Sequence, residues 1–508
     1  MPTIGTSRLK RVGFSPNQPR SILGPLAAAA LTGAGFAIRY LNSPVVPHAS
    51  GDAWHRWSDQ SEYMRSAFAL SSFSFASDQH HYPLFYSLFA APFMRLLPND
   101  PFLVVDLISI CMCAGLLTVL FRRDCGSCLA VAFSVLSLAG NGLVAQAFIV
   151  PWTSTLAMPF ILASLVIMRW ADDAFEFPAR ASFLLGLLIG LIFLTRPLDG
   201  LIIGAALAPF WMLRVYRQYG LSFRHAVAFG GGGLIGPLAS LISNLVIHHQ
   251  ALSPYMRGHA TRLVIQDIPE KLVSLFLDSE PLYLEAGQTI FAKFPWMVIA
   301  LPAMAICLAL GNNGLRAAVA AIALFAAAYA SFDDLIPNVL FRYGNYHYLR
   351  WLLVMAPMMA IPAVALWRQA SPATRVWTLL MAASCFLPAF VVLKTADRSV
   401  PVMASGQLVT IKAGGAAFDY VDISPASAAW EDVFFDDPQV QIDGRKIRHD
   451  RRDVRMLPAG QVIRVLFNRP EAGQEISLNV EKLKIDPHGI SARLGSYYFG
   501  FGFPRWLN

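Results

Sequence analysis

Charged residues are scarce in this sequence: they make up 14% of its 508 residues, whereas hydrophobic residues make up 56%. A soluble protein of this length can bury a large core, but it still needs a charged surface. Hydrophobic runs of about 17–24 residues recur up to residue 393, and runs of this length cross a bilayer as helices. The sequence therefore predicts an α-helical multi-pass membrane protein rather than a soluble one.

Cysteine is also rare, and all six cysteines lie in or beside hydrophobic runs: Cys111, Cys113, Cys125, Cys128, Cys307 and Cys385. The last hundred or so residues contain none, which argues against a disulfide framework there. Cys125 and Cys128 have redox or zinc spacing, but no second pair or nearby histidine completes a site. The glycines at 230–233 lie in a hydrophobic run without a following Lys-Ser or Lys-Thr, so they indicate helix packing rather than a phosphate loop.

The hydrophobic runs predict eleven spans, with boundaries placed to within a few residues. They are residues 21–41, 101–121, 128–144, 148–170, 181–195, 201–216, 226–247, 291–310, 315–332, 348–367 and 374–393. Arginines and lysines gather before the first span and in alternate short loops. Short cytoplasmic loops are enriched in these residues, so these loops are expected on the cytoplasmic side. This pattern predicts a bacterial inner membrane protein with a cytoplasmic N-terminus and an odd number of spans. The net charge of +8 is explained by this topology, so no nucleic-acid partner is expected.

Residues 81–97 are hydrophobic but short, and Pro83 and Pro92 interrupt them. Counting them as a span would put Arg122 and Arg123 outside, so we expect them to lie on the outer face. From residue 394 the pattern changes to short alternating runs separated by turn signals such as Asp443-Gly444. This alternation predicts a transmembrane domain over 1–393, whose outer loop 42–100 carries the site, and a soluble β-rich extracytoplasmic domain over 394–508.

The outer loop 42–100 contains most of the side chains that could take part in catalysis or binding. From Ser58, a candidate N-cap, it has the spacing of an amphipathic helix, with Asp59 and Glu62 in its first turn and Tyr63 following. Next comes the aromatic segment Asp78-Gln-His-His-Tyr-Pro-Leu-Phe-Tyr. Charges are costly next to a membrane, so acids gathered in one outer loop indicate a functional site.

These elements resemble, in their order, the GT-C superfamily of integral membrane glycosyltransferases, which use polyprenyl-phosphate sugar donors. The matching features are a first span, an outer acidic-x-x-x-Tyr helix, a His-Tyr-Pro segment and a second span ending in Arg-Arg. The wording is close to the branch of protein mannosyltransferases and aminoarabinose transferases. The strong part of the resemblance covers residues 20–125, and the span count and outer C-terminal domain extend it.

The resemblance implies an inverting transfer in which a carboxylate of the first outer loop acts as general base on an acceptor hydroxyl. Asp59 matches the expected position best, Asp52 is its rival after Gly51, and Glu62 shares the helix turn. The alternative is that Asp59 only favours the positive end of the helix dipole. Asp78 is a weak metal candidate, since a divalent metal is left open, and a solvated loop acid is the plainer interpretation.

Cations that stabilise the leaving phosphate are expected near the outer ends of the helices. The candidates are Arg342, Arg350, Arg196, Arg257 and Arg262. Anchoring to lipid head groups explains Arg342 or Arg350 equally well, and a structural ion pair with Asp199 explains Arg196 equally well. Tyr63, His81 and Tyr82 belong to the matching motifs and are candidate substrate-binding residues.

Two other classes remain open beside the glycosyltransferase. A lipid-linked glycan flippase or transporter should show repeated halves and mid-span charges, whereas Asp106 is the clearest mid-span charge and no halves are visible. An O-antigen-type ligase or polymerase would need an arginine-rich loop and a late catalytic histidine, for which His259 is the nearest match. The expected partners are the bilayer, a polyprenyl-phosphate-linked sugar as donor substrate, and a glycan, lipid or protein acceptor.

Overall fold

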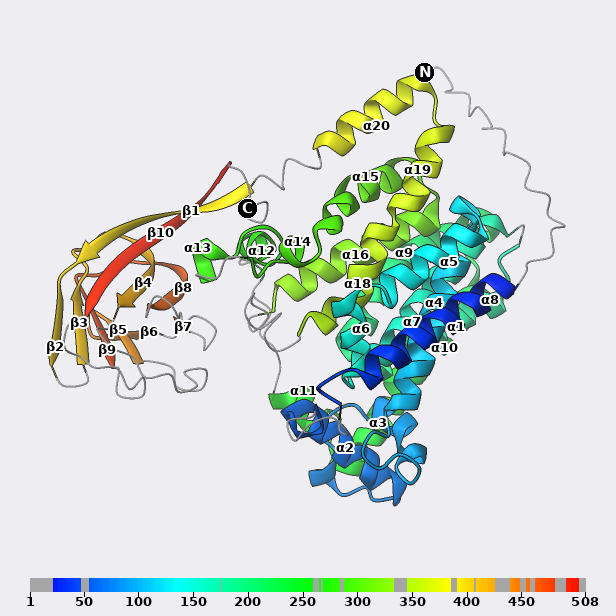
Figure 1. Ribbon diagram of the computed structural model, residues 1–508, viewed down its shortest axis with the longest axis horizontal. Coiled ribbons are helices and arrows are strands. Elements are labelled where there is room, and N and C mark those ends of the chain that lie inside the picture. Colours follow the sequence, from blue (N-terminus) through cyan, green and yellow to red (C-terminus); the bar gives the residue numbers. More distant parts are fainter. Residues whose placement is uncertain are drawn as a thin grey trace.

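A helical bundle and a β-sandwich make up the chain (Figure 1), which is described here by a computed structural model. The described residues are 22–46, 54–174, 176–258, 265, 268–283, 287–332, 345–384, 391–405, 408–424, 439–447, 454–456, 462–479 and 490–501.

The bundle is built from helices that are mostly hydrophobic along their length. They are α1 (Leu23–Leu41), α4 (Leu103–Cys125), α5 (Ser127–Leu138), α6 (Gly142–Ile149), α7 (Thr153–Asp173), α8 (Ala179–Thr195), α9 (Pro197–Tyr219), α10 (Phe223–His248), α15 (Ala300–Leu310), α16 (Asn313–Ala330), α18 (Arg350–Met358), α19 (Ala360–Gln369) and α20 (Pro372–Ser384). Among the described residues, six helical stretches are long and hydrophobic enough to cross a membrane, or seven if the bent pair α5 and α6 forms one span. The multi-pass helical architecture is confirmed, and the count of eleven stays a prediction.

Helix ends follow local sequence signals. Asn141 and Asn312 cap α6 and α16 by accepting hydrogen bonds from Val144 N (3.2 Å) and Leu315 N (3.1 Å). Gly126 follows α4 with φ 82°, a conformation in which a side chain would be strained. Of these signals, only Asn141 lies inside a predicted hydrophobic run, whereas Gly126 and Asn312 lie between runs that the sequence pattern already separates.

Three expected spans differ from the structure. In the run 291–310, Phe294 separates a short helix, Ile290–Lys293, from the 3-10 helix Pro295–Ile299 and α15. The run 128–144 is divided between α5 and α6, which are bent by 67°, because Asn141 starts a new helix within it. Of the run 374–393, residues 374–384 lie in α20 and residues 391–393 lie in strand β1. The β-branched Val391 and Val392 pair with the last strand of the sandwich, so residues 391–393 belong to the sheet.

Close packing of α8 on α10 explains part of the glycine run. A Cβ at Gly232 would overlap the carbonyl oxygen of Phe183, and one at Gly190 would lie 2.9 Å from the carbonyl oxygen of Gly233. By contrast, a Cβ at Gly230 or Gly231 would meet nothing within 4 Å. Small residues on one side of α10 therefore let the two backbones touch, as helices in membranes often do.

Short helices form the segments between the bundle helices. The first loop contains η1 (Trp54–Arg56), α2 (Ser58–Ser71), η2 (Ser77–Gln79), α3 (Leu84–Ala90) and η3 (Ala91–Phe93). The later segments contain α11 (Pro254–Gly258), α12 (Ile268–Leu272), η5 (Val273–Leu277), α13 (Glu280–Tyr283), α14 (Ile290–Lys293), η6 (Pro295–Ile299) and η7 (Asn345–Leu349). The stretch 84–93 is short, as its prolines predicted, and its seat on the outer face stays a prediction.

Tyrosine–aspartate hydrogen bonds fix both ends of the first loop to the bundle. Tyr40 at the end of α1 donates to Asp100 Oδ2 (2.6 Å), and Tyr86 on α3 donates to Asp106 Oδ1 on α4 (2.7 Å). A small hydrophobic core that includes Trp54, Tyr63, Tyr86, Phe102 and Trp152 fills the space between. The loop is thus a packed layer over one end of the bundle, which gives its side chains defined positions.

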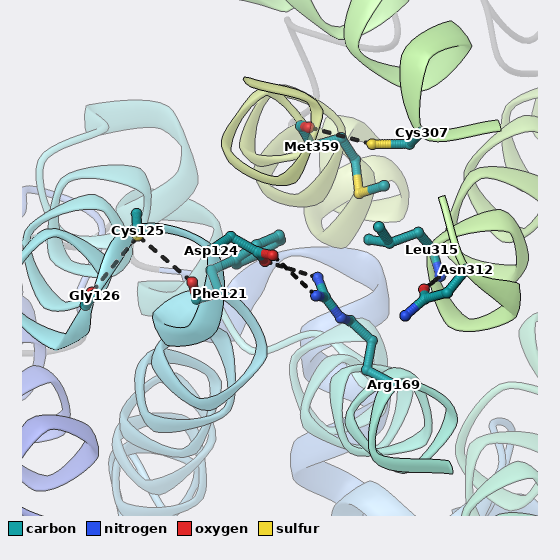
Figure 2. A network of polar contacts seen from close by, with 9 residues as sticks. All are labelled: Phe121, Asp124, Cys125, Gly126, Arg169, Cys307, Asn312, Leu315 and Met359. Carbon is teal, nitrogen blue, oxygen red and sulfur yellow. Dashed lines mark hydrogen bonds and ion pairs between the residues drawn. The ribbon is translucent and has the colours of Figure 1, made fainter. Parts of the chain in front are cut away.

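Polar contacts join helices at the opposite end of the bundle (Figure 2). Arg169 near the end of α7 makes a two-pronged contact with Asp124 near the end of α4, at 2.9 and 3.1 Å. The backbone N–H of Gly314, which begins α16, donates to Asp172 Oδ2 at 2.5 Å. Arg169 and Arg316 therefore lie at one end of the bundle, as expected. Which side of the membrane this end faces stays a prediction.

The C-terminal region folds as the expected β-rich domain, with two five-stranded sheets. One has the order β1 (Val391–Val400), β10 (Ser491–Phe501), β4 (Phe418–Ser424), β8 (Ile463–Glu471), β7 (Val454–Met456). The other has the order β2 (Val402–Ser405), β3 (Leu408–Lys412), β9 (Glu475–Asn479), β5 (Gln439–Ile442), β6 (Arg445–Ile447). A shared core includes Ile411 and Leu478 from one sheet and Val421 and Val465 from the other, so the domain is a sandwich.

Candidate functional site

Asp59 lies in the first turn of α2 and is held by a tyrosine. The Tyr82 hydroxyl donates to Asp59 Oδ1 over 2.6 Å. Glu62, one turn later, is instead paired with the neighbouring Arg65. The two acids of the turn thus have different partners. The cap prediction was wrong by one residue: Ser58 is the first residue of α2, and Trp57 precedes it without a side-chain cap.

An aromatic cluster surrounds the Asp59–Tyr82 pair. The Tyr82 ring lies 4.9 Å from Tyr63 and 4.7 Å from Tyr255, which α11 brings in from a segment far along the chain. His81 stands 6.0 Å from the same Tyr255 ring. Burial, reinforced by the Asp59 carboxylate, raises the pKa of Tyr82, so its hydroxyl remains a hydrogen-bond donor.

Tyr63 connects this acidic side of the site to a cationic side. Its ring is buried, and burial raises its pKa first, followed by the charge of Asp59 and the hydroxyls of Tyr348 and Tyr255. Arg196 acts on Tyr63 in the opposite direction. A single side chain on α2 is therefore within electrostatic range of both the Asp59 carboxylate and the Arg196 guanidinium.

Arg196 sits between α8 and α9 and is held by three groups. Its Nε lies 2.9 Å from Asp199 Oδ2, while its other nitrogens donate to the Tyr329 hydroxyl (2.7 Å) and to Thr153 Oγ1 (3.3 Å). The guanidinium carbon is 4.7 Å from the centre of the Tyr348 ring. Residues from α7, α9, α16 and η7 thus fix one positive charge at this end of the bundle.

Arg350 has a different setting from Arg196. It is 1% exposed, it donates to Thr155 Oγ1 and to the carbonyl oxygen of Ala147, and its guanidinium lies 4.3 Å from the centre of the Phe148 ring. Those contacts join α18 to α6 and α7, which is a structural role. A phosphate-binding role for Arg350 stays a prediction that these contacts do not favour.

His347 packs beside this arginine. Its ring stacks on Trp152 with 3.6 Å between centres and contacts Ser154 Oγ at 3.0 Å. The side chain is 1% exposed. It therefore supports the start of α7, where Thr153 contacts Arg196.

The residues around Asp78 do not fit a metal. Both ring nitrogens of His80 are in hydrogen-bond contact within the protein, with Ser66 Oγ (2.9 Å) and with the carbonyl oxygen of Ser74 (3.0 Å). Across the described ranges, no three His, Cys, Asp or Glu side chains are grouped so that they could hold a metal ion. Asp78 itself is exposed.

Three predicted site residues, Asp52, Arg342 and Arg262, lie outside the described residues. Arg257 is exposed on α11, two residues after Tyr255. The site thus joins Asp59, Tyr63, His81, Tyr82 and Arg196 among the predicted residues.

Sequence reasoning missed four partners of the site: Thr153, Tyr255, Tyr329 and Tyr348. Tyrosines near the ends of hydrophobic runs are common membrane-interface residues, so nothing in the local pattern distinguished these. The one available signal was Arg196 with Asp199 at a helix start, because such a pair needs further hydrogen-bond partners when it is buried.

Neither a protein-family profile nor a curated relative matches the sequence. Two solved structures resemble 71% of this chain: ArnT from Cupriavidus metallidurans in the apo state (TM-score 0.44, 15% identity) and bound to undecaprenyl phosphate (TM-score 0.42, 17% identity). The match spans 64% of the length of each of those chains. At these values the likeness is partial, and the function has to be argued from the residues of this chain.

Proposed function

We propose that this chain is a GT-C-type membrane glycosyltransferase that moves a sugar from a polyprenyl-phosphate donor to an acceptor hydroxyl, with inversion, on the outer face of a bacterial inner membrane. The observation that carries the proposal is that a carboxylate oriented by Tyr82, Asp59, and a guanidinium held by Asp199, Arg196, both act electrostatically on the same buried ring, Tyr63. The order of motifs in residues 20–125 supports the same class.

Asp59 is the proposed general base. The acceptor hydroxyl gives its proton to the carboxylate as its oxygen forms a bond to the anomeric carbon. The bond from that carbon to the phosphate oxygen breaks in the same displacement, and the phosphate leaves with the electron pair. Tyr82 holds Asp59 Oδ1 at 2.6 Å, which fixes the direction of the carboxylate before the acceptor arrives.

Arg196 is the proposed cation for the leaving phosphate. Its charge is fixed by Asp199, Tyr329 and Thr153, so little reorganisation is needed when negative charge develops on the phosphate. The side chain is 12% exposed, so it is shielded from most of the solvent that would weaken the attraction. Arg342 and Arg262 remain proposed phosphate contacts, and Arg257 stands beside Tyr255 on α11.

The donor class, the acceptor and the topology belong to the same proposal. The N-terminus is cytoplasmic, the sandwich is extracytoplasmic, and the donor is a lipid-linked sugar that reaches the site from the bilayer. The acceptor is a hydroxyl of a glycan, lipid or protein.

A transfer assay with matched acids of α2 tests the proposal. Membranes carrying Asp59→Asn are compared with Glu62→Gln, using radiolabelled undecaprenyl-phosphate sugars as donors and following label released from the carrier. We expect Asp59→Asn to lower turnover at least about 100-fold, the range for loss of a general base, while retaining donor binding. Glu62→Gln should stay near wild type because Glu62 is paired with Arg65.

Asp52→Asn and Arg342→Ala complete this series. If Asp52→Asn is inactive and Asp59→Asn is active, the base is reassigned to Asp52 within the same function. Full activity of both acid variants would remove the first-loop carboxylate mechanism. No transfer by the wild-type chain from any polyprenyl-phosphate sugar would remove the function.

A lipid-linked glycan flippase is a second candidate because two charged residues, Asp106 and Arg350, are 1% exposed within helices. Carriers use such intramembrane charges to move substrates. Here both have local partners, Tyr86 for Asp106 and Thr155 for Arg350, which favours a structural role. Movement of a fluorescent polyprenyl-phosphate sugar across liposomes without chemical transfer would favour the flippase.

A further inference from the structure

Strands β1 and β10 continue together beyond the rest of their sheet. Their register pairs Val391 with Phe501 and runs without a break to Val400 with Ala492. On the other side of β10, the pairs with β4 extend only from Ser491 to Gly495. Residues 391–396 and 496–501 therefore form a two-stranded ribbon, with no third strand among the described residues.

The ribbon points out of the sandwich toward the helical bundle (Figure 1). β1 contacts η5 and α13, and Tyr497 packs against a hydrophobic cluster that includes residues of the bundle and Tyr420 and Leu466 of the sandwich. The chain leaves α20 at Ser384 and enters the ribbon at Val391. Six intervening residues span at most about 25 Å, so the ribbon begins within that distance of α20, on which Val376 and Trp377 are exposed.

Large hydrophobic side chains remain exposed on both faces of the ribbon. Tyr498 is 53% and Phe499 is 45% exposed, and because neighbours along a strand point to opposite faces, they belong to different faces. Lys394 pairs directly with Tyr498, so the two share a face, and Lys394 is also exposed. An isolated two-stranded ribbon is marginal in water, and exposed aromatic side chains add to that cost.

The sequence around the ribbon has the same character. Phe386-Leu-Pro-Ala-Phe390 precedes β1, and Gly502-Phe-Pro-Arg-Trp-Leu-Asn508 follows β10. Aromatic side chains with an occasional cation are the composition that membrane–water interfaces favour, since rings suit the headgroup level and Lys or Arg suits lipid phosphates. A water-facing ribbon would gain nothing from this composition.

We propose that this ribbon is a membrane-surface anchor, with Tyr498 and Phe499 seated in the headgroup layer of an anionic phospholipid bilayer and Lys394 at the level of the lipid phosphates. The anchor holds the sandwich at a fixed orientation beside the bundle. It requires no particular reaction at the Asp59 site, so it stands or fails independently of the proposed function.

Depth-dependent quenching tests the anchor on the full chain in nanodiscs. Phe499→Cys and Tyr498→Cys are each labelled with the fluorophore NBD in a Cys128→Ser background, because Cys128 is exposed. Lys446→Cys, on an exposed position of β6 in the other sheet, is the matched control. Nanodiscs contain phosphatidylethanolamine and phosphatidylglycerol, with or without a nitroxide-labelled headgroup lipid.

We expect blue-shifted emission at 498 and 499 and loss of fluorescence with the nitroxide lipid, with neither change at 446. Blue-shifted emission without quenching would mean that the ribbon is covered by protein, and unshifted emission would mean that it faces water. Either outcome overturns the proposal. When phosphatidylcholine replaces the anionic lipid mixture, quenching should weaken in the labelled chain that keeps Lys394. In the labelled chain with Lys394→Gln, quenching should be the same in both lipid mixtures. Equal lipid dependence in both would remove Lys394 from the anchor.

Discussion

The two ends of the helical bundle each contain an aspartate–arginine pair that is at least half-buried, yet the pairs differ in what they connect. At one end Arg169 of α7 donates two hydrogen bonds, of 2.9 and 3.1 Å, to the carboxylate of Asp124 of α4 (Figure 2). At the other, Arg196 pairs with Asp199, three residues away at the start of α9. The first pair joins two helices that are distant in sequence, whereas the second is local.

This difference indicates two uses for the same chemistry. A bidentate pair between helices uses up the fork geometry of arginine and fixes helix positions. In the local pair, helices are joined instead through the neutral hydroxyls of Tyr329 and Thr153, and aromatic residues connect the site to Asp59. One end is joined by an ion pair between helices, and the other holds a fixed charge in the same site as the proposed base, Asp59.

Replacing each arginine in turn should give the largest effect, with loss of activity for one variant and loss of stability for the other. Arg196→Ala should lower transfer at least about 100-fold, as loss of a charge-stabilising donor does. Arg169→Ala should lower thermal stability but leave the activity of each folded molecule within severalfold of wild type. Transfer rates normalised to folded protein by gel filtration, with the melting temperature, measure both effects.

Arg196→Lys guards against misfolding, since it keeps the charge beside Asp199 but loses the fork. It should fold and recover part of the activity that Arg196→Ala lacks. If Arg169→Ala reduces specific activity as much as Arg196→Ala, the comparison between the two ends is wrong.

Tyr82→Phe should have the next largest effect. The ring remains packed between Tyr63 and Tyr255, but the hydrogen bond to Asp59 is lost. Hydrogen bonds to charged groups contribute roughly 1.5–3 kcal/mol, so we expect kcat to fall at least about tenfold with little change in donor KM. A raised KM with unchanged kcat would make Tyr82 a substrate contact rather than a positioning residue.

Asp100, at the end of the bundle that carries the first loop, makes the stability of the protein depend on pH. Burial raises its pKa from 3.8 to about 6, against hydrogen bonds from Tyr40 and Leu103 that lower it. Because the folded-state pKa is raised, the stability that protonated Asp100 contributes is fully present below the pKa of the unfolded state. It is lost as the pH rises through about 6. Two pKa units correspond to about 3 kcal/mol at most.

The melting temperature of the wild type should therefore fall between pH 4 and pH 7 relative to Asp100→Asn, which cannot ionise. Asp78→Asn, in an exposed loop position, should follow the wild type. Parallel curves for wild type and Asp100→Asn would show that Asp100 is not protonated in the folded protein.

The glycines of α10 offer the smallest effect and a matched pair. Gly232→Ala introduces a Cβ against the carbonyl oxygen of Phe183, whereas Gly231→Ala meets nothing within 4 Å. Overpacking costs about 1–3 kcal/mol, and Gly→Ala in an open helix position gains about 0.5–1 kcal/mol. We expect opposite shifts in melting temperature, and similar shifts would mean that α8 and α10 are not in backbone contact.

Several features could be predicted from the sequence because they depend on local pattern. Hydrophobic runs gave the helices, alternating runs gave the strands, and Asp443-Gly444 gave the β5–β6 turn, where both residues have positive φ. Breaks inside hydrophobic runs were less visible, since the helix starting after Asn141 and the strand starting at Val391 both lie within residues of suitable hydropathy.

The site divides in the same way. Asp59, Tyr63 and Tyr82 were recognisable because they lie in one loop with a distinctive order of motifs, and their contacts are near in sequence. Tyr255 and Tyr329 were not, because they approach from segments 173 and 130 residues away from their partners Tyr82 and Asp199. Arg196 and Arg350 looked equivalent until their surroundings were known.

The sequence by itself determined whether lipid or water surrounds each segment, since the hydropathy of a run decides this. It also determined that the C-terminal region forms sheets, since its hydrophobic residues alternate. Only the tertiary structure decided which of several similar acids and arginines share a site. Membrane helices of similar composition can pack in many arrangements at similar cost, so side-chain contacts across the bundle, not patterns along the chain, select one.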